Sequence, residues 1–184
     1  NITVYLDGAG TASITTMDVD GGSSDNCGLD SLTLSQNFFT CADVGANMVT
    51  LTVSDVNGNS SNCMATVTVM DSVPPTAVCQ NVTVYLNASG QATVHASDLE
   101  NGSTDNCGIF ANAIFTGVTY VDSLIFTCSD IGANAVTYAV GDASANISYC
   151  VATVTVEDTV PPVAVCNNIT VYLDPTGNAS ITSG

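Results

Sequence analysis

Asn1-Ile-Thr-Val-Tyr-Leu6 decides the fold of this chain, because the same six-residue pattern returns twice. It reads Asn81-Val-Thr-Val-Tyr-Leu86 the second time and Asn168-Ile-Thr-Val-Tyr-Leu173 the third time. Apolar and polar residues alternate along it with a period of two, which is typical of a strand with one buried face. The three copies start at residues 1, 81 and 168, so a unit of roughly this size is repeated along the chain.

Other stretches repeat in the same order between these copies. Cys41-Ala-Asp-Val-Gly-Ala-Asn returns from Cys128, and Cys63-Met-Ala-Thr-Val-Thr-Val returns from Cys150. Gly- and Asn-rich turns separate short alternating segments, and no stretch has a helical period. Six or seven short strands in each repeat predict an all-β fold of tandem immunoglobulin-like β-sandwiches, with two full repeats plus the start of a third.

Double prolines mark the expected junctions between modules, at Pro74-Pro75 and Pro161-Pro162. Proline cannot donate a hydrogen bond to a strand ladder, and it favours a stiff, extended connection. We therefore predict one sandwich in residues 1–73, a second in 74–160, and the first strands of a truncated third repeat in 161–184. The modules then follow one another as a semi-rigid rod. Because the chain starts inside a strand-like segment, we expect it to be a fragment of something longer.

The charge is one-sided: the chain has 17 acidic residues, no lysine and no arginine, and a formal net charge of −17. Without cations it cannot neutralise nucleic-acid phosphates or bind anionic membranes through charge. We expect no membrane insertion either, since no long apolar run is present. Divalent cations would relieve the repulsion among the carboxylates. Eight cysteines in register with the repeat indicate disulfides and an extracellular or cell-surface location.

The cysteines allow several pairings. Local pairing would join Cys27 to Cys41, and in the second repeat Cys107 to Cys128. Cys79 opens the first strand of the second repeat and Cys150 opens its last strand; these strands commonly lie side by side in such sandwiches, so we predict a Cys79–Cys150 disulfide. Cys63 would then need a cysteine preceding Asn1, and Cys166 one following Gly184. The rival pair, Cys63–Cys79, requires the proline linker to fold back.

An acidic stretch occurs once in each full repeat, from Asp18 to Gly28 and from Asp98 to Gly108. Oxygen-rich loops of this kind suit a hard cation, and we predict structural Ca²⁺. Acidic residues near the linkers would complete the shell if loop and linker converge at the junction, which would make the site a junction clamp. The alternative is that these aspartates only form local Asx-turns. The candidate metal ligands are Asp18, Asp20, Asp25, Asp55, Asp71, Asp98, Glu100, Asp105, Asp142 and Asp158.

These boxes together resemble the hyalin repeat (HYR) family. They are the two Asp-Asn-Cys-Gly boxes, the Cys-x-Asp-x-Gly-x-Asn-x-Val-Thr box from Cys41, the Asn-Gly turn after Asp55, and the Pro-Pro-x-Ala-x-Cys entry that begins at Pro74. The Thr-Val-Thr-Val strands are similar to repeats of large secreted bacterial surface proteins. The resemblance implies an immunoglobulin-like extracellular module, found in tandem in adhesive and matrix proteins, and it brings no catalytic residues.

The leading functional prediction is a non-catalytic extracellular structural protein that forms a fibre, stalk or adhesin shaft. Its partners would be further repeats of the same chain and identical chains in a filament. One alternative is an adhesion module whose loop from Phe110 to Ser123 binds a surface glycan or protein; another is an accessory domain of a secreted enzyme. We expect no catalytic site, since His95 is the only histidine and no nucleophile motif is present. Glycosylation sequons occur at Asn1, Asn59, Asn81, Asn87, Asn101, Asn146, Asn168 and Asn178.

Overall fold

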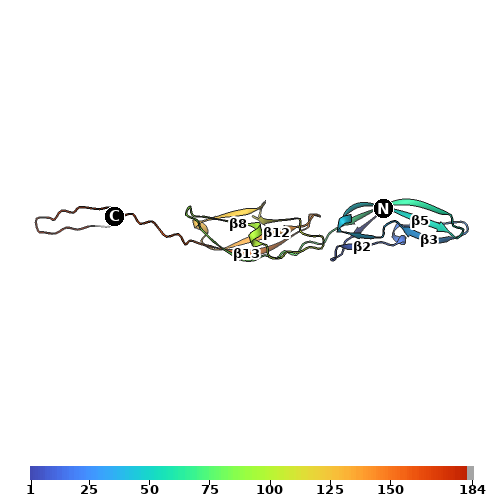
Figure 1. Ribbon diagram of the computed structural model, residues 1–184, viewed down its shortest axis with the longest axis horizontal. Helices are drawn as coiled ribbons and strands as arrows, with labels where there is room; N and C mark the ends of the chain where they lie inside the picture. The colour runs from blue at the N-terminus through green and yellow to red at the C-terminus, as the bar shows by residue number, and fades with distance from the viewer. Residues whose placement is uncertain (182–184) are drawn as a thin grey trace.

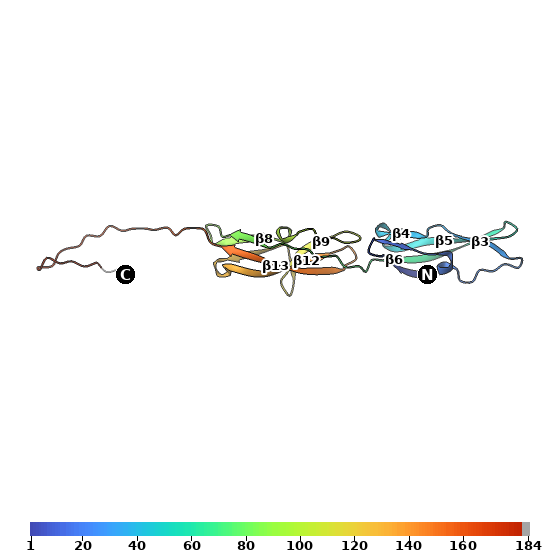
Figure 2. The same cartoon turned by 90° about the horizontal axis from the view of Figure 1, so that it is seen from below.

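The computed structural model describes residues 1–181 and shows two strand-rich modules arranged end to end (Figure 1). A view turned by 90° shows the same elongated arrangement, with an extended tail beyond the second module (Figure 2). The tandem repeat of the sequence thus becomes a rod, since each module has its own sheets and its own core.

The first module is a sandwich of a four-stranded sheet, in the order β1-β6-β5-β3, and a two-stranded sheet of β2 and β4. β1 pairs with β6 in parallel, and the other neighbours are antiparallel. Its strands are β1 (Ile2–Tyr5), β2 (Thr11–Ser13), β3 (Leu29–Leu34), β4 (Phe38–Thr40), β5 (Gly45–Asp55) and β6 (Ser60–Met70).

The second module repeats this design with one addition. Its larger sheet has the order β10-β9-β12-β13-β7, and its smaller sheet pairs β11 with β8. The short strand β10 has no counterpart in the first module, and it accommodates the residues inserted between Cys107 and Cys128. The strands are β7 (Val82–Tyr85), β8 (Gln91–His95), β9 (Ala111–Phe115), β10 (Tyr120–Val121), β11 (Ser123–Thr127), β12 (Gly132–Gly141) and β13 (Ile147–Glu157). Each module is therefore an immunoglobulin-like β-sandwich, as the sequence predicts.

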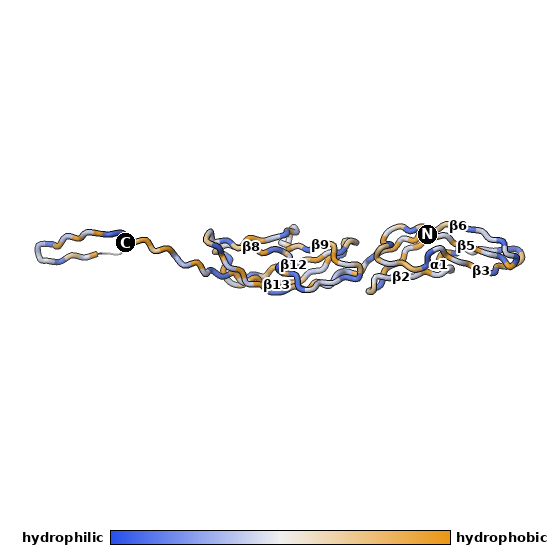
Figure 3. Tube along the Cα trace, in the orientation of Figure 1, coloured by the Kyte–Doolittle hydropathy of each residue, from blue (hydrophilic) through white to orange (hydrophobic). Residues whose placement is uncertain are grey.

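The cores follow from the two-residue alternation. Figure 3 shows apolar and polar residues interleaved along the strands of both modules. In β6, Val67 and Val69 are buried while the one threonine between them is only partly buried, and Val154 and Val156 repeat this in β13. Phe39 of the first module is fully buried, which anchors the smaller sheet on the larger one.

Single helical turns interrupt the strands at four places: α1 (Thr16–Val19), α2 (Ala96–Leu99), η1 (Cys41–Asp43) and η2 (Cys128–Asp130). They are too short to give a periodic signal in the sequence. Each one has an aspartate at its third position whose side chain accepts a backbone N–H at the start of the turn. None of the helices in residues 1–181 has the length and apolar character needed to cross a bilayer.

The predicted first strands of a third repeat do not form: residues 158–181 contain no strand, and only a turn around Thr176. The reason lies in the topology, because the first strand of each module pairs in parallel with the last strand of the same module. The 184-residue sequence holds no such last strand for Asn168–Leu173. The predicted boundaries at residues 73 and 160 fall after β6 and after β13, respectively.

Candidate metal centre

The linker between the modules places one carboxylate at their junction. Asp71 directly follows β6, and the chain then runs along the acidic loop of the second module. Thr76 forms an isolated antiparallel bridge with Thr104, and the Val78 N–H donates to Ser103 Oγ at 3.0 Å. Because the linker is fixed to this loop, Asp71 lies at the point where the loop continues into Asp105.

Three carboxylates from three different segments meet there. Asp71 comes from the linker, Asp105 from the acidic loop, and Asp142 from the end of β12. One carboxylate oxygen of each lies within 4.8 Å of those of the other two. Two oxygens that each lie about 2.4 Å from one calcium ion are at most about 4.8 Å apart, so this spacing fits a single ion. Magnesium has shorter bonds and a stricter geometry, so it fits less well.

Two of the three carboxylates are buried and Asp105 is partly buried, although their charges have the same sign. Asp71 is 6% exposed and Asp142 is 4% exposed, and these are the only buried polar or charged residues among the described part of the chain. The sequence contains no lysine or arginine to pair with them. Burying carboxylates beside one another without a counter-charge is costly, so the arrangement favours a bound cation.

Unpartnered oxygens point to the same conclusion. Asp71 Oδ2, Asp105 Oδ1 and Asn106 Oδ1 are buried and have no hydrogen-bond partner. Such groups are rare in folded proteins, because each one loses its bonds to water without a replacement. Oxygens of carboxylates and of an amide are the ligands that calcium prefers.

The remaining oxygens of the cluster hold it in shape. Asp142 Oδ1 accepts the backbone N–H groups of Ser144 at 2.9 Å and Asn146 at 2.8 Å, and Asp142 Oδ2 accepts Asn146 Nδ2 at 2.7 Å. Asn106 Nδ2 donates to Asp71 Oδ1 at 3.2 Å and to the backbone carbonyl of Asp7 in the first module at 3.0 Å. Asn106 therefore connects the cluster to both modules. The sequence does not predict a role for Asn106, because a single asparagine in a Gly- and Ser-rich loop carries no distinguishing signal.

Four of the predicted ligands serve the local structure of the acidic loops instead. Asp18 and Asp98 cap the turns α1 and α2, and Asp20 accepts the Ser23 N–H at 3.0 Å. Glu100 accepts the N–H groups of Gly102 and Ser103 together with the hydroxyl of Tyr138. These carboxylates bind their own loops, as the Asx-turn alternative predicts, and the structure does not bring them into the cluster.

The other three predicted ligands lie at the outer ends of the two modules. Asp25 and Asp55 are the repeat counterparts of Asp105 and Asp142, and they line one pocket of about 160 Å³ at the far end of the first module. Asp158 is the counterpart of Asp71; it is exposed after β13 and accepts the Val160 N–H at 3.0 Å. Each outer end therefore has only some of the carboxylates that form the cluster at the junction.

The disulfides correct one prediction and agree with another. The local pairs Cys27–Cys41 and Cys107–Cys128 are wrong, because Cys41 of the first module bonds to Cys107 of the second across the junction. Cys79 and Cys150 form the predicted disulfide within the second module. Cys63 is free, so the rival pair Cys63–Cys79 does not form. In the described part of the chain, Cys27, Cys63, Cys128 and Cys166 are free.

A signal for the crossing pair was present in the sequence. The second repeat has its insertion between Cys107 and Cys128, whereas the first repeat has none between Cys27 and Cys41. Local pairs would therefore have to close loops of different length in two otherwise matching modules. A pair that crosses the junction is independent of this insertion.

Several sequon asparagines already use their side chains in the fold. Asn1 Oδ1 accepts the Thr66 N–H at 3.0 Å, and Asn81 Oδ1 accepts the Thr153 N–H at 2.7 Å. Asn59 Nδ2 donates to Asp55 at 2.8 Å, in the same way that Asn146 donates to Asp142. Glycosylation at all eight sequons, Asn87, Asn101, Asn168 and Asn178 included, stays a prediction.

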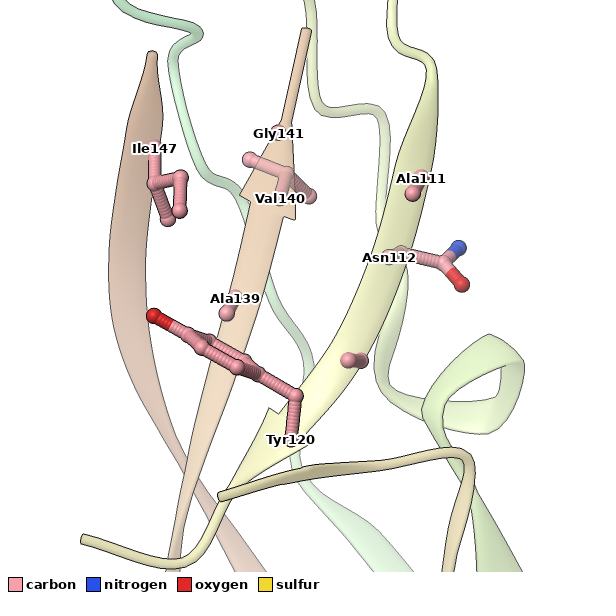
Figure 4. A pocket seen from close by; sticks show the side chains of 8 residues that line it. Ala111, Asn112, Tyr120, Ala139, Val140, Gly141 and Ile147 are labelled. Carbon is pink, nitrogen blue, oxygen red and sulfur yellow. The ribbon is translucent and has the colours of Figure 1, made fainter. Parts of the chain in front are cut away.

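A small pocket in the second module is the alternative site for a ligand. It has a volume of about 200 Å³ and lies against β9, β10, β12 and β13 (Figure 4). Tyr120 lies across it, and Asn112 is the one lining side chain with an amide; the others are small or aliphatic. Sites for small ligands are usually larger and combine several convergent polar groups, so this pocket does not favour a specific glycan site.

The chain is similar to known proteins over most of its length. Over 94% of its length the chain is 28% identical to Hyalin of Lytechinus variegatus, and the match spans 32% of that protein, about a third. Among solved structures, human mucin-like protocadherin EC1-2 is 9% identical with a TM-score of 0.38, covering 86% of this chain and 96% of that one. The fibronectin(III)-like modules of CbhA from Clostridium thermocellum are 12% identical with a TM-score of 0.34, covering 80% of this chain and 88% of that one.

The family assignment rests on the second module together with its linker. Residues 70–156 match the HYR domain, and this range contains Asp71, Asp105 and Asp142 as well as the three disulfide-bonded cysteines of the second module. The first module repeats the Asp-Asn-Cys-Gly box and, from Cys41, the Cys-x-Asp-x-Gly-x-Asn-x-Val-Thr box in the same order. The second module with its linker, residues 70–156, is therefore an HYR domain.

Proposed function

We propose that this chain is a non-catalytic, extracellular structural segment in which calcium and a disulfide lock successive HYR modules into a rod. The observation that carries the proposal is the buried cluster of Asp71, Asp105 and Asp142 at the junction, with its unpartnered oxygens. Each ligand belongs to a different segment, so an ion bound there would tie linker, loop and hairpin to one another.

The ligands have separate roles in this proposal. Asp71 Oδ2 and Asp105 Oδ1 offer free carboxylate oxygens, and Asn106 Oδ1 adds an amide oxygen beside them. Asp142 is held by the turn that ends at Asn146 and supplies a third charge. Water would complete the six to eight ligands that calcium takes. Without the ion, repulsion among three carboxylates, two of them buried, would loosen the junction and leave the two cores intact.

An extracellular setting supports the proposal from two sides. Disulfides persist in oxidising compartments, and two are formed here. Calcium sites of extracellular modules commonly have dissociation constants on the order of 10⁻⁴ to 10⁻³ M, which suits a site with a partly open shell. Further modules of the same kind, in the same chain or in a filament, are the partners that a rod of this design requires.

Isothermal titration with calcium chloride tests the site directly. We expect one ion per chain, and at least tenfold weaker binding in the double variant Asp71→Asn/Asp105→Asn, which keeps the side-chain shapes. Asp20→Asn is the matched control, since Asp20 binds only its own loop. Equal binding by the double variant and the native chain would overturn the site.

Small-angle scattering tests the mechanical role. Calcium should narrow the distribution of overall lengths in the native chain and leave the double variant unchanged. If the ion binds with the expected stoichiometry and the length distribution does not respond, the site exists but does not stiffen the junction.

A further inference from the structure

The outer ends of the two modules carry the separated halves of the junction. At the free end of the first module, Asp25, Asn26 and Cys27 correspond to Asp105, Asn106 and Cys107. Asp55 and Asn59 form the same hydrogen-bonded turn as Asp142 and Asn146, with an N–H to carboxylate distance of 2.8 Å in both. This end therefore has every element that the second module contributes to the junction.

The far end of the second module has the elements that the first module contributes. Cys128 corresponds to Cys41, and Asp158 corresponds to Asp71. A Cβ atom added to Gly90 would lie 2.9 Å from Cys128 Sγ, just as one added to Gly10 would lie 2.6 Å from Cys41 Sγ. The cysteine thus has the same position against its neighbouring turn in both modules, although only Cys41 has a partner.

The free cysteines divide into two complementary pairs. By the repeat register, Cys128 matches Cys41 and Cys27 matches Cys107, which is the pair that crosses the junction. Cys166 matches Cys79 and Cys63 matches Cys150, which is the pair within the second module. All four cysteines that are free in residues 1–181 are accounted for by a single head-to-tail arrangement.

We propose that the two ends of this chain are complementary docking surfaces for a further module of the same repeat, joined head to tail by Cys128–Cys27 and Cys166–Cys63 disulfides. The occupant continues the register that Asn168-Ile-Thr-Val-Tyr-Leu173 already starts, since this hexapeptide is identical to Asn1–Leu6. Asp158 of one unit then joins Asp25 and Asp55 of the next, as Asp71 joins Asp105 and Asp142.

The chemistry of the joining step balances with a small-molecule disulfide as the oxidant. The two thiols of Cys128 and Cys27 lose two protons and two electrons and form one sulfur–sulfur bond. Glutathione disulfide accepts them, and its own sulfur–sulfur bond breaks to give two glutathione thiols. The same exchange joins Cys166 to Cys63.

A tandem chain tests the proposal, with residues 1–167 followed directly by the full chain 1–184. The fusion restores the native register, because Asn1–Leu6 takes the place of the identical Asn168–Leu173. After refolding with reduced and oxidised glutathione, thiols are counted in denaturant without reductant. Refolding is done at a protein concentration low enough to keep the outer ends of different molecules apart. Four free cysteines per copy would then give eight thiols if the copies ignore each other, and four if the central ends join.

Matched variants separate the predicted pairs from adventitious ones. Cys27→Ser in the second copy should raise the count to five, because Cys128 of the first copy loses its partner. The same substitution in the first copy should lower the count to three, because that cysteine lies at an outer end. Peptide mapping after cleavage at aspartates should find Cys128 of the first copy joined to Cys27 of the second.

Eight thiols, or a map that joins these cysteines to others, would overturn the proposal. The thiol readout does not depend on calcium, so it separates a failure of head-to-tail joining from a failure of the metal site. The tandem chain has one junction within each copy and one between the copies. If all three junctions bind calcium, the titration should show three bound ions per tandem chain instead of the one expected for the single chain.

Discussion

Cys41 and Cys107 lie in different modules, yet their Cα atoms are 5.3 Å apart and their sulfurs are bonded. The bond fixes η1 of the first module against the acidic loop of the second, next to Asn106 and the carboxylate cluster. The junction therefore contains a disulfide and a carboxylate cluster, and each can be removed separately by substitution.

Removing this disulfide should uncouple the modules. The cysteines are 66 residues apart. Closing a loop of that length lowers the conformational entropy of the unfolded chain, which corresponds to a gain of about 4 kcal/mol in the free energy of unfolding at 25 °C. We expect Cys107→Ser to destabilise the chain by up to this amount and to split one thermal transition into two. Cys128→Ser is the control: Cys128 is free and exposed, so calorimetry should show a change below about 0.5 kcal/mol. A single unchanged transition in Cys107→Ser would contradict the coupling.

Gly10 and Gly90 offer a matched pair at the same turn of the two modules. Both have positive φ, 73° and 74°, so alanine strains either turn by about 1 kcal/mol. At Gly10, however, the added Cβ would lie 2.6 Å from the bonded Cys41 Sγ and 2.8 Å from the Asn106 carbonyl oxygen. At Gly90 the close atom is the sulfur of the free Cys128, which can rotate away.

We therefore expect Gly10→Ala to impair formation of the inter-module disulfide and Gly90→Ala to leave it intact. Mass spectrometry of the alkylated, non-reduced chains measures this directly. Equal disulfide yields in the two variants would show that the close contact between the modules is not needed for the bond.

The sequence predicted what depends on local pattern. Alternation of apolar residues and threonine is sufficient to locate β6 and β13, because burial on one face dictates that period. The repeat also predicted the Cys79–Cys150 bond, since it joins the first and last strands of one module. Both inferences need only the fold of a single module.

What the sequence left open depends on how two modules meet. Asp105 and Asp98 have similar sequence surroundings, but one enters the cluster and the other caps a turn. Their difference arises because the linker pairs with the loop at Thr104, which brings Asp71 to Asp105 and to no other acid of that loop. Likewise, the local pair Cys27–Cys41 requires only one module, whereas the Cys41–Cys107 bond that forms depends on how the two modules meet.

Ala145 holds the turn beside Asp142 in a left-handed conformation, with φ of 67°. Its counterpart in the first module is Gly58, with φ of 87°, and both turns make the same hydrogen bonds to their aspartates. Any residue with a Cβ atom is strained by about 1–2 kcal/mol in this conformation. Part of this cost is offset, because glycine would lose more conformational entropy than alanine on folding. We expect Ala145→Gly to stabilise the second module by about 1 kcal/mol and to raise the Tm of the single thermal transition of the chain by about 2–4 °C.

The reverse change in the first module, Gly58→Ala, should lower the stability by a similar amount. Calorimetry of the two variants checks both signs. If Ala145→Gly destabilises the module, then the alanine methyl makes contacts that outweigh the strain.

The hydrogen bond from Tyr138 to Glu100 should make the free energy of unfolding depend on pH at both acidic and alkaline pH. Desolvation by itself would raise the pKa of Glu100, but hydrogen bonds from Tyr138, Ser103 and Gly102 outweigh it, and the net pKa is lowered. Desolvation and the hydrogen bond to Glu100 raise the pKa of Tyr138. The carboxylate stabilises the fold above its unfolded pKa, about 4.3, and this contribution is lost as the pH falls through the lower folded value.

For Tyr138 the sign is opposite: its contribution is full below its unfolded pKa, about 10, and is lost as the pH rises through the folded value above it. Tyr138→Phe should cost about 1.5–3 kcal/mol at neutral pH, because a hydrogen bond to a charged, partly buried carboxylate is lost. It should also weaken the decline in stability above about pH 10. Tyr85→Phe, at an exposed tyrosine, is the control for both effects. Denaturant unfolding between acidic and strongly alkaline pH measures them, and an alkaline decline that is the same in Tyr138→Phe and the native chain would show that another group causes it.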